Sequence, residues 1–471
     1  MRFTIVGHAG LYVESRHTDL LVDPWLFGSC YWRSWWHYPP IGDVQEEWLT
    51  PKYVYLSHHH FDHFHYPSLR RIDRDAHVLV PRFGVDVMRE ELSNLGFSRV
   101  TELAPGAPME LGDGLIVRSY QYGVDDSTLV VRHGSTVIAD FNDCKVRGAA
   151  LRHMIRQAGR PTFLLKNYSA AQAYPGCYQA EREADLGMIS RSSYLVDFLG
   201  TAAATSPRYA VPFASMTCFL HPETAARNEE IVRPVDLVSA FERAPISGTE
   251  LAVMAPGDSW DEDEGFSLAP TDPFANFEAT VKKMQFDATP AVDAALLEES
   301  TQTLDYDSFA LYFGAFVQAL PPGLPHMVHG SVVFHGPDVD RPYWVIDIRR
   351  RTVYRSYQRP DGWASLIRVP PGVLADAMDK EIVNFVHISM RLQIELNEGG
   401  VGTDFMFWGL LTIWELGYFP VRRLRFRRVA AVAWARRREF LDMARSQVGG
   451  KGTTAERMAS SLMPSRTDDT A

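Results

Sequence analysis

The stretch that decides the fold is residues 53–64, YVYLSHHHFDHF. Its first five residues are mostly aromatic or aliphatic and predict a short strand. The pattern H-x-H-x-D-H follows at once, as His58, His60, Asp62 and His63. Residues two apart in an extended loop project the same way, so His58 and His60 can bind one cation. Asp62 and His63 come where the chain turns and can reach a second cation. Imidazole and carboxylate are ligands for zinc, iron or manganese, so the stretch predicts a metal site; the alternative is a fortuitous histidine cluster.

Short segments of similar character surround this stretch and predict further strands. Residues 84–96 and 146–159 instead repeat apolar residues at helical spacing, and a further long helix is expected over much of 180–199. Strands that come early, with helices arriving later, favour a layered α/β sandwich. The predicted strands are RFTIV (2–6), LYVES (11–15), LLVDPW (20–25), HVLVP (77–81), LIVRSYQY (115–122), TLVVRHG (128–134) and STVIADF (135–141).

The chain of 471 residues is long enough for several domains, and its 46% apolar content supplies their cores. We predict a metal-binding domain over 1–240 and an acidic linker or insertion over 241–300, within which residues 257–274 are expected to form an exposed crossing. A C-terminal α+β domain is expected over 301–448, followed by a disordered tail over 449–471.

Charge and hydrophobicity limit the expected partners. The net charge of 47 − 58 = −11 predicts that the protein does not bind nucleic acid, because phosphate binding needs a clustered positive field. The longest apolar stretch, residues 405–414, is shorter than the ~20 residues of a membrane span. The first residues lack the apolar core of a signal peptide. We therefore expect a cytoplasmic protein that does not enter a membrane.

Residues 422–445 hold nine arginines against Glu439 and Asp442. A solvated final helix explains them, and a docking surface for an acidic partner is the alternative.

The motif after the strand resembles that of the metallo-β-lactamase superfamily. The resemblance implies an αββα sandwich with one or two metal ions at the sheet edges. It implies that His58 and His60 belong to the first metal site, and Asp62 and His63 to the second. His59 and His65 do not fall on motif positions.

The same resemblance implies further ligands from later strands. Where a third histidine is expected the chain has GVDDSTLVV, so the candidates are Asp125 and Asp126, of which we prefer Asp126. In FNDCK, Asp143 matches the bridging carboxylate, with Asp140 as runner-up. His221 in CFLHPE is a candidate closing ligand, or an ordinary loop histidine. Asp62 and Asp143 are the predicted catalytic residues.

Several residues are candidates for supporting the site or lining the substrate. Asp23 ends a predicted strand, where it can accept a hydrogen bond from a ligating histidine or simply start an Asp-Pro turn. His8 can face the site from a strand-end turn. The aromatic-dense segment 25–48 is either a lid or a hydrophobic cluster under a loop. The predicted wall residues are Trp35, Trp36, Tyr168 and Tyr174.

The order of several segments along the chain is similar to that in nucleotide-sugar hydroxylases of the CMP-N-acetylneuraminate and UDP-N-acetylmuramate type. These segments are VGHAGLYVES, LLVDPW, LSHHHFDHF, FNDC, NYSAAQAYPGCY and PFASMTCFLHPE. Those enzymes also carry a Rieske iron–sulfur module, whose cysteine–histidine clusters are not found in these 471 residues.

Two functions follow from these resemblances. The first is an oxygenase that hydroxylates a small metabolite with two divalent metal ions, iron favoured and zinc or manganese possible, and with an external electron donor. A carboxylate in place of a third imidazole favours iron or manganese over zinc. The alternative is a hydrolase of an ester, lactone, amide or phosphodiester that uses a metal-activated water.

Overall fold

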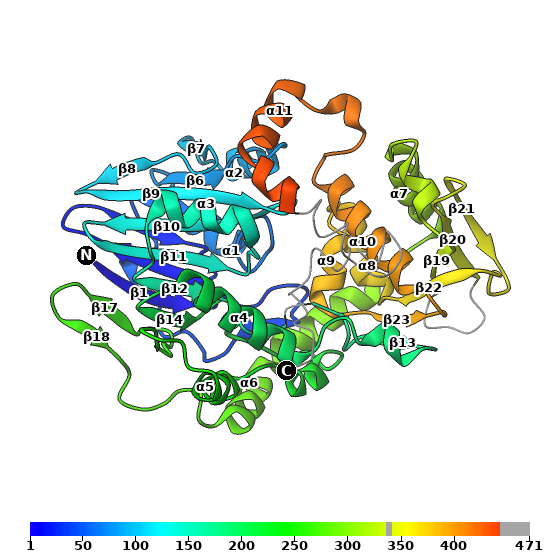
Figure 1. Ribbon diagram of the computed structural model, residues 1–471. Coiled ribbons are helices and arrows are strands. Elements are labelled where there is room, and N and C mark those ends of the chain that lie inside the picture. The colour runs from blue at the N-terminus through cyan, green and yellow to red at the C-terminus, as the bar shows by residue number, and fades with distance from the viewer. Residues whose placement is uncertain (171, 336–341, 443–471) are drawn as a thin grey trace.

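Two β-sheets lie face to face in the first half of the chain (Figure 1). The computed structural model describes residues 1–170, 172–335 and 342–442. The first sheet has the order β18 (Gly265–Ser267), β17 (Ser259–Asp261), β1 (Arg2–Gly7), β2 (Gly10–Glu14), β3 (Asp19–Val22), β5 (Tyr53–Tyr55), β6 (His77–Pro81), β7 (Val100–Leu103). The second has the order β16 (Glu250–Leu251), β14 (Tyr209–Pro212), β12 (Phe163–Lys166), β11 (Thr136–Asn142), β10 (Asp126–His133), β9 (Leu115–Tyr122), β8 (Met109–Gly112).

The core between the sheets comes from the alternation of side chains along the strands. Phe3 and Ile5 of β1 and Leu115 and Val117 of β9 are fully buried in one apolar cluster. Because side chains two apart share a face, the intervening residues point to the outer faces, where helices cover them. This burial is what fixes the register of each strand.

Helices cover both outer faces, so the predicted αββα sandwich is confirmed. Leu69, Met88 and Leu92 of α1 and α2 pack on the first sheet. Leu151 of α3 and Phe198 of α4 pack on the second. These helices are α1 (Tyr66–Leu69), α2 (Val87–Asn94), α3 (Gly148–Ala158), α4 (Arg191–Thr205) and α5 (Pro234–Arg243).

The segment 241–300 contributes to both halves of the molecule. We expected residues 257–274 to be an exposed crossing, but β17 pairs with β1 and extends the first sheet. Phe266 of β18 packs on Phe163 and Tyr209. The segment ends in the long helix α6 (Phe277–Thr301). The boundaries at 240 and 300 stay a prediction.

A third sheet with helices forms the predicted C-terminal α/β region (Figure 1). Its strand order is β13 (Tyr178–Ala180), β23 (Gln393–Leu396), β22 (Trp363–Arg368), β19 (Ser331–Phe334), β20 (Tyr343–Asp347), β21 (Thr352–Ser356). Its helices are α7 (Tyr306–Ala319), α8 (Pro371–Asp379), α9 (Asn384–Ser389) and α10 (Val401–Glu415), and α11 (Phe426–Ala435) returns to the sandwich.

One predicted helix differs from the structure. We expected a helix over much of 180–199, but α4 begins only at Arg191 because Ser190 and Ser193 cap it. The preceding residues form β13, which pairs with β23 of the third sheet. A short two-stranded sheet also joins β4 (Trp35–His37) to β15 (Thr217–Phe219). The predicted tail, 449–471, lies outside the described residues.

Within residues 1–170, 172–335 and 342–442, no helix combines the length and the apolar character that crossing a membrane requires.

Candidate metal centre

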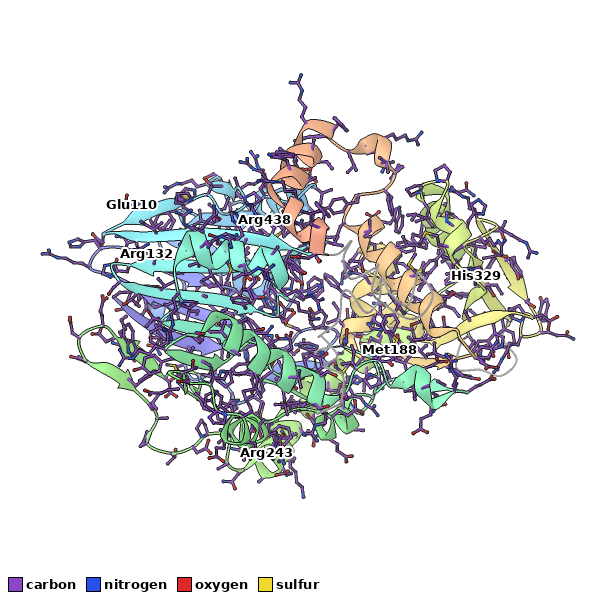
Figure 2. The ribbon with its side chains drawn as sticks, viewed as in Figure 1. Glu110, Arg132, Met188, Arg243, His329 and Arg438 are labelled. Atoms are coloured by element: carbon purple, nitrogen blue, oxygen red, sulfur yellow. The ribbon has the colours of Figure 1, made fainter. Side chains whose placement is uncertain are left out.

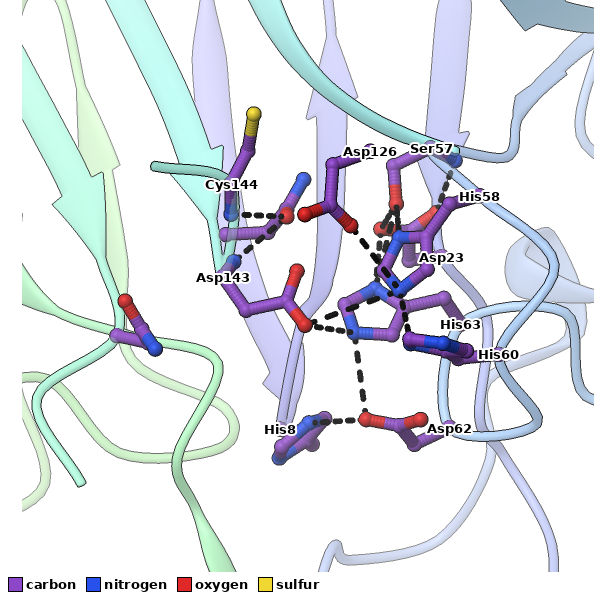
Figure 3. Close-up of polar contacts among 12 residues, drawn as sticks. His8, Asp23, Ser57, His58, His60, Asp62, His63, Asp126, Asp143 and Cys144 are labelled. Carbon is purple, nitrogen blue, oxygen red and sulfur yellow. Dashed lines mark hydrogen bonds and ion pairs between the residues drawn. The ribbon is translucent and has the colours of Figure 1, made fainter. Parts of the chain in front are cut away.

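The motif loop follows β5 at one edge of the sandwich (Figure 3). Because β3 and β5 are parallel, the end of β3 reaches the same edge and places Asp23 beside the loop. The loop then turns on itself, with the Phe64 amide donating to the His60 carbonyl at 2.6 Å. This turn brings Asp62 and His63 back toward His58.

The second sheet delivers two carboxylates to the same edge. Asp126 is the first residue of β10, and Asp143 follows the end of β11. The antiparallel register pairs Leu129 with Asp140, which sets Asp126 across from Asp143. Asp143 is further fixed by Asn142, whose side-chain oxygen accepts from the Asp143 amide at 2.6 Å.

A first cluster joins His58, His60 and Asp143, with one possible ligand atom of each within 4.8 Å of the others. His58 Nε2 lies 2.8 Å from His60 Nδ1 and 3.7 Å from Asp143 Oδ2. Asp126 Oδ1 lies 3.9 Å from the same His58 nitrogen, and Asp125 Oδ2 lies 3.8 Å from His60 Nε2. The carboxylates of both Asp125 and Asp126 therefore face this cluster.

A second cluster joins His8, Asp62 and His63 under the same limit. Asp62 Oδ2 lies 2.9 Å from His8 Nε2 and 3.2 Å from His63 Nε2. Asp143 Oδ2 lies 3.9 Å from His63 Nε2, so one carboxylate oxygen faces an imidazole of each cluster. That is the position a bridging carboxylate needs. His8, expected only to face the site, belongs to this cluster.

Asp23 fixes the protonation of two of these histidines. Its carboxylate can only accept, so His63 Nδ1 donates to it at 2.7 Å and the Ser57 hydroxyl donates at 2.6 Å. The Ser57 oxygen, 2.9 Å from His58 Nδ1, then accepts from that nitrogen. Both Nδ1 atoms carry protons, and both Nε2 lone pairs are left for the clusters.

The charges at the site are strongly coupled. Burial alone would lower the pKa of His63, but the carboxylates of Asp62, Asp143 and Asp23 outweigh it and raise that pKa well above its usual value. Burial and the neighbouring Asp143 raise the pKa of Asp126. For Asp143, the imidazoles led by His58 overcome burial and lower its pKa.

The donor set fits metal ions. Among the described residues, His63 Nε2 and Asp143 Oδ1 are buried and lack a hydrogen-bond partner. Such atoms are costly to bury unless something binds them. A cation among these imidazoles and carboxylates would satisfy His63 Nε2 and offset the repulsion between Asp126 and Asp143.

The two clusters differ in exposure. The side chains of His58 and His63 are fully buried, whereas those of Asp126, Asp143 and His60 are 27%, 24% and 20% exposed. Solvent therefore reaches the site along the edge where the second sheet delivers its carboxylates.

Aromatic residues also pack against the two clusters, and sequence reasoning missed two of them. Tyr31 donates to Asp62 Oδ1 at 2.5 Å. Phe385 of α9 lies edge-on to His60, with ring centres 5.5 Å apart, and to Phe61 at 4.7 Å. Trp35, a predicted wall residue, lies 6.2 Å from the His8 ring. Tyr31 sits in the aromatic segment 25–48, but no local signal points to Phe385.

Other predicted residues make contacts outside the two clusters. His221 is in neither cluster of the described residues, and its Nδ1 accepts from the Glu223 amide at 3.2 Å. Trp36 Nε1 donates to the Arg33 carbonyl. Tyr168 packs among the helices on the second sheet, and the Tyr174 hydroxyl donates to the Asp185 carbonyl. Asp140, the runner-up to Asp143, is fully buried and accepts from the Asn142 amide.

A cavity of about 590 Å³ lies where the sandwich meets the C-terminal region. Among its lining residues are Trp32, His59, Phe61, Lys380 and Phe385. Phe385 contacts both this cavity and the His60 ring, so the C-terminal region adjoins the metal centre directly.

Comparison with known families matches residues 2–163 to the family described as the beta-lactamase superfamily domain. The N-terminal part of the chain is a member of that superfamily. With its two His/Asp clusters, this domain is that of a metal-dependent enzyme.

Two curated relatives extend the comparison. A "Putative Rieske 2Fe-2S iron-sulfur protein" of Mycolicibacterium smegmatis is 31% identical over 250 residues, 50% of this chain and 48% of the relative. The cytidine monophosphate-N-acetylneuraminic acid hydroxylase of Danio rerio is 27% identical over 150 residues, 30% of this chain and 25% of the relative. The chain thus spans about half, or less, of the length of these relatives.

Two solved structures are similar to part of the chain. The diiron β-hydroxylase CmlA of Streptomyces venezuelae has a TM-score of 0.34 at 18% identity, covering 45% of this chain and 44% of its own. An isothiocyanate hydrolase from Delia radicum gut bacteria has a TM-score of 0.41 at 17% identity, covering 55% of this chain and 99% of its own.

Proposed function

We propose that the protein is an oxygenase that hydroxylates a small metabolite with two iron ions and an external electron donor. The observation that supports this most directly is the composition of the clusters, each of two histidines and one aspartate. Two histidines and one carboxylate, with other positions open, are typical of non-haem Fe(II) oxygenases. The relatives named as a hydroxylase and as an iron–sulfur protein agree with this choice.

His58, His60 and Asp126 would hold one ion, and His8, Asp62 and His63 the other, with Asp143 between them. Bound ferrous ions would supply electrons and open positions for the reduction of O₂. The overall reaction, R–H + O₂ + 2e⁻ + 2H⁺ → R–OH + H₂O, needs two electrons from a donor. We propose that this donor is a separate redox protein or a module outside these 471 residues.

The chain's own groups prepare the site for this chemistry. Asp23 keeps the protons of His58 and His63 on Nδ1, through Ser57 for the former. Tyr31 holds Asp62 by a hydrogen bond, which orients the other carboxylate oxygen toward His8 and His63. The aromatic residues packed against the clusters exclude water, and the exposed carboxylate edge admits the substrate.

The test is a comparison of two metal forms of one preparation. Protein purified without oxygen is loaded with two equivalents of Fe(II) or of Zn(II), and then mixed with O₂ or with generic ester and phosphodiester substrates. We expect the iron form to consume O₂ in a single turnover and to develop an Fe(III) spectrum. His60→Ala is the control that should lose this reaction.

An iron form that does not react with O₂, together with a zinc form that hydrolyses esters or phosphodiesters without oxygen, would overturn the proposal and select the hydrolase.

A further inference from the structure

The loop that carries Asp125 and Asp126 is a tight connection between β9 and β10. β9 ends at Tyr122 and β10 begins at Asp126, and the two residues pair across the hairpin. Gly123 starts the loop with a φ of +69°, a conformation that favours glycine. The position of these two carboxylates therefore depends on how three loop residues are held.

The C-terminal segment holds the start of this loop by both backbone groups. Glu439 Oε1 accepts from the Gly123 amide at 2.8 Å, and Arg436 Nη2 donates to the Gly123 carbonyl. The two side chains also pair with each other, with Arg436 Nε donating to Glu439 Oε2 at 2.8 Å. Their side chains are only 7% and 3% exposed.

The same segment contacts the middle of the loop and the sandwich around it. The Tyr418 hydroxyl donates to the Val124 carbonyl at 3.3 Å. Further along, Arg428 pairs with Glu102 on β7 and donates to the carbonyls of Phe83 and Val85. Figures 1 and 2 show α11 lying on the sandwich, with Arg438 beside α3.

A buried arginine–carboxylate pair adds little net stability to the packing of a helix on a surface. Desolvation of the two charges offsets most of their attraction, and apolar residues of the same size do as well or better. What the pair provides here, and apolar residues cannot, is one donor and one acceptor for a single glycine backbone three residues from Asp126.

We propose that Arg436 and Glu439 are positioning residues of the metal centre, which act by fixing the loop that presents Asp125 and Asp126 to the first cluster. This inference rests on the ligand assignment within the proposed function, but not on the reaction. It also assigns a role to part of the arginine-rich segment: Arg428 and Arg436 dock it on its own chain, whereas Arg422, Arg423 and Arg427 are exposed.

The test replaces the pair by apolar residues of similar size, as Arg436→Met with Glu439→Leu, so that no charge is left buried alone. The matched control is Arg428→Met with Glu102→Leu, which removes another pair between the same segment and the sandwich without touching the loop. Cobalt(II) titration, followed by its visible absorption spectrum, reports the affinity and geometry of each site without reference to turnover.

We expect wild type and control to bind two equivalents with the same spectrum. The Arg436/Glu439 variant should bind one ion 10- to 100-fold more weakly, the usual effect of losing groups that orient ligands. Glu439→Asp, which keeps the acceptor, should restore part of this affinity relative to Glu439→Leu.

Wild-type affinity for both ions in the Arg436/Glu439 variant would overturn the inference, as would an equal loss in the control. If the double variant does not fold, Arg436→Lys replaces it, because lysine keeps the charge beside Glu439 but lacks the planar fork that contacts both Glu439 and the Gly123 carbonyl. Unchanged cobalt affinity and spectrum in that variant would overturn the inference too. Wild-type protein that binds no metal would instead refute the proposed function, so the two failures can be told apart.

Discussion

Replacing Asp23 by asparagine should separate the folding role of this residue from its control of the metal ligands. The fully buried carboxylate accepts three hydrogen bonds, from the Ser57 amide at 2.7 Å, the Ser57 hydroxyl at 2.6 Å and His63 Nδ1 at 2.7 Å. An asparagine of the same shape offers only one acceptor oxygen. At least one hydrogen-bond donor must therefore face the NH₂ group that replaces the second oxygen.

Either orientation of the asparagine has a defined cost. If the asparagine oxygen accepts from the Ser57 amide, the NH₂ group faces His63 Nδ1. The His63 proton must then move to Nε2, where it blocks the lone pair that would bind a metal ion. If it keeps His63, the buried Ser57 amide loses its acceptor. One unsatisfied buried donor costs about 1–3 kcal/mol, a fraction of the about 5–15 kcal/mol that stabilises a domain, so Asp23→Asn should fold. Metal affinity at the second cluster should fall 10- to 100-fold.

The assay is metal competition against a chelator of known affinity, with urea unfolding of the metal-free protein. Asp140→Asn is the matched control, because burial raises the pKa of Asp140 well above its usual value and no metal-cluster histidine donates to it. It should keep wild-type affinity. Tight binding of both ions by Asp23→Asn would refute the argument from proton positions.

Three further variants test the site and its surroundings. His60→Ala should lose one of two bound ions by elemental analysis while His59→Ala keeps both, and equal losses would mean that the ligand register is wrong. Burial raises the pKa of Asp404 from 3.8 to about 6. Between these two pH values its folded form holds a proton that the unfolded form has released, so wild type should lose about 2 kcal/mol of unfolding free energy relative to Asp404→Asn between pH 4 and pH 7. Urea titrations at both pH values check this, and a constant difference would contradict it. Phe385→Ala should cost about 3–5 kcal/mol in the same assay while metal content is unchanged, and a loss below ~1 kcal/mol would show that Phe385 does not pack as described.

Most strands of the sandwich could be predicted from local patterns in the sequence. Short segments rich in β-branched and aromatic residues predicted β1, β9 and β11, and each of these strands has one face toward the core between the sheets. The motif at 58–63 was visible because its donors follow each other in one loop. The end of a predicted strand also singled out Asp23, and the resemblance to the metallo-β-lactamase superfamily singled out Asp143.

Contacts between distant segments could not be predicted in the same way. His8 is a lone histidine in a turn, and only the pairing of β1 with β2 brings it to Asp62. His221 looked equally suitable, yet its loop turns the ring toward Glu223. Arg436 reaches Gly123 across 313 residues of sequence, and an arginine-rich stretch gives no sign of that partner.

The contact between Gly123 and the pair Arg436–Glu439 has a consequence for how the protein is made. At about 5–20 residues per second, a ribosome adds residue 436 about 15–60 s after residue 126. During that interval the nascent sandwich already contains His58, His60, Asp62 and His63, but not the segment that holds their carboxylate neighbours. Selective, tight loading of metal should therefore come only after the ribosome has added the segment that contains Arg436 and Glu439.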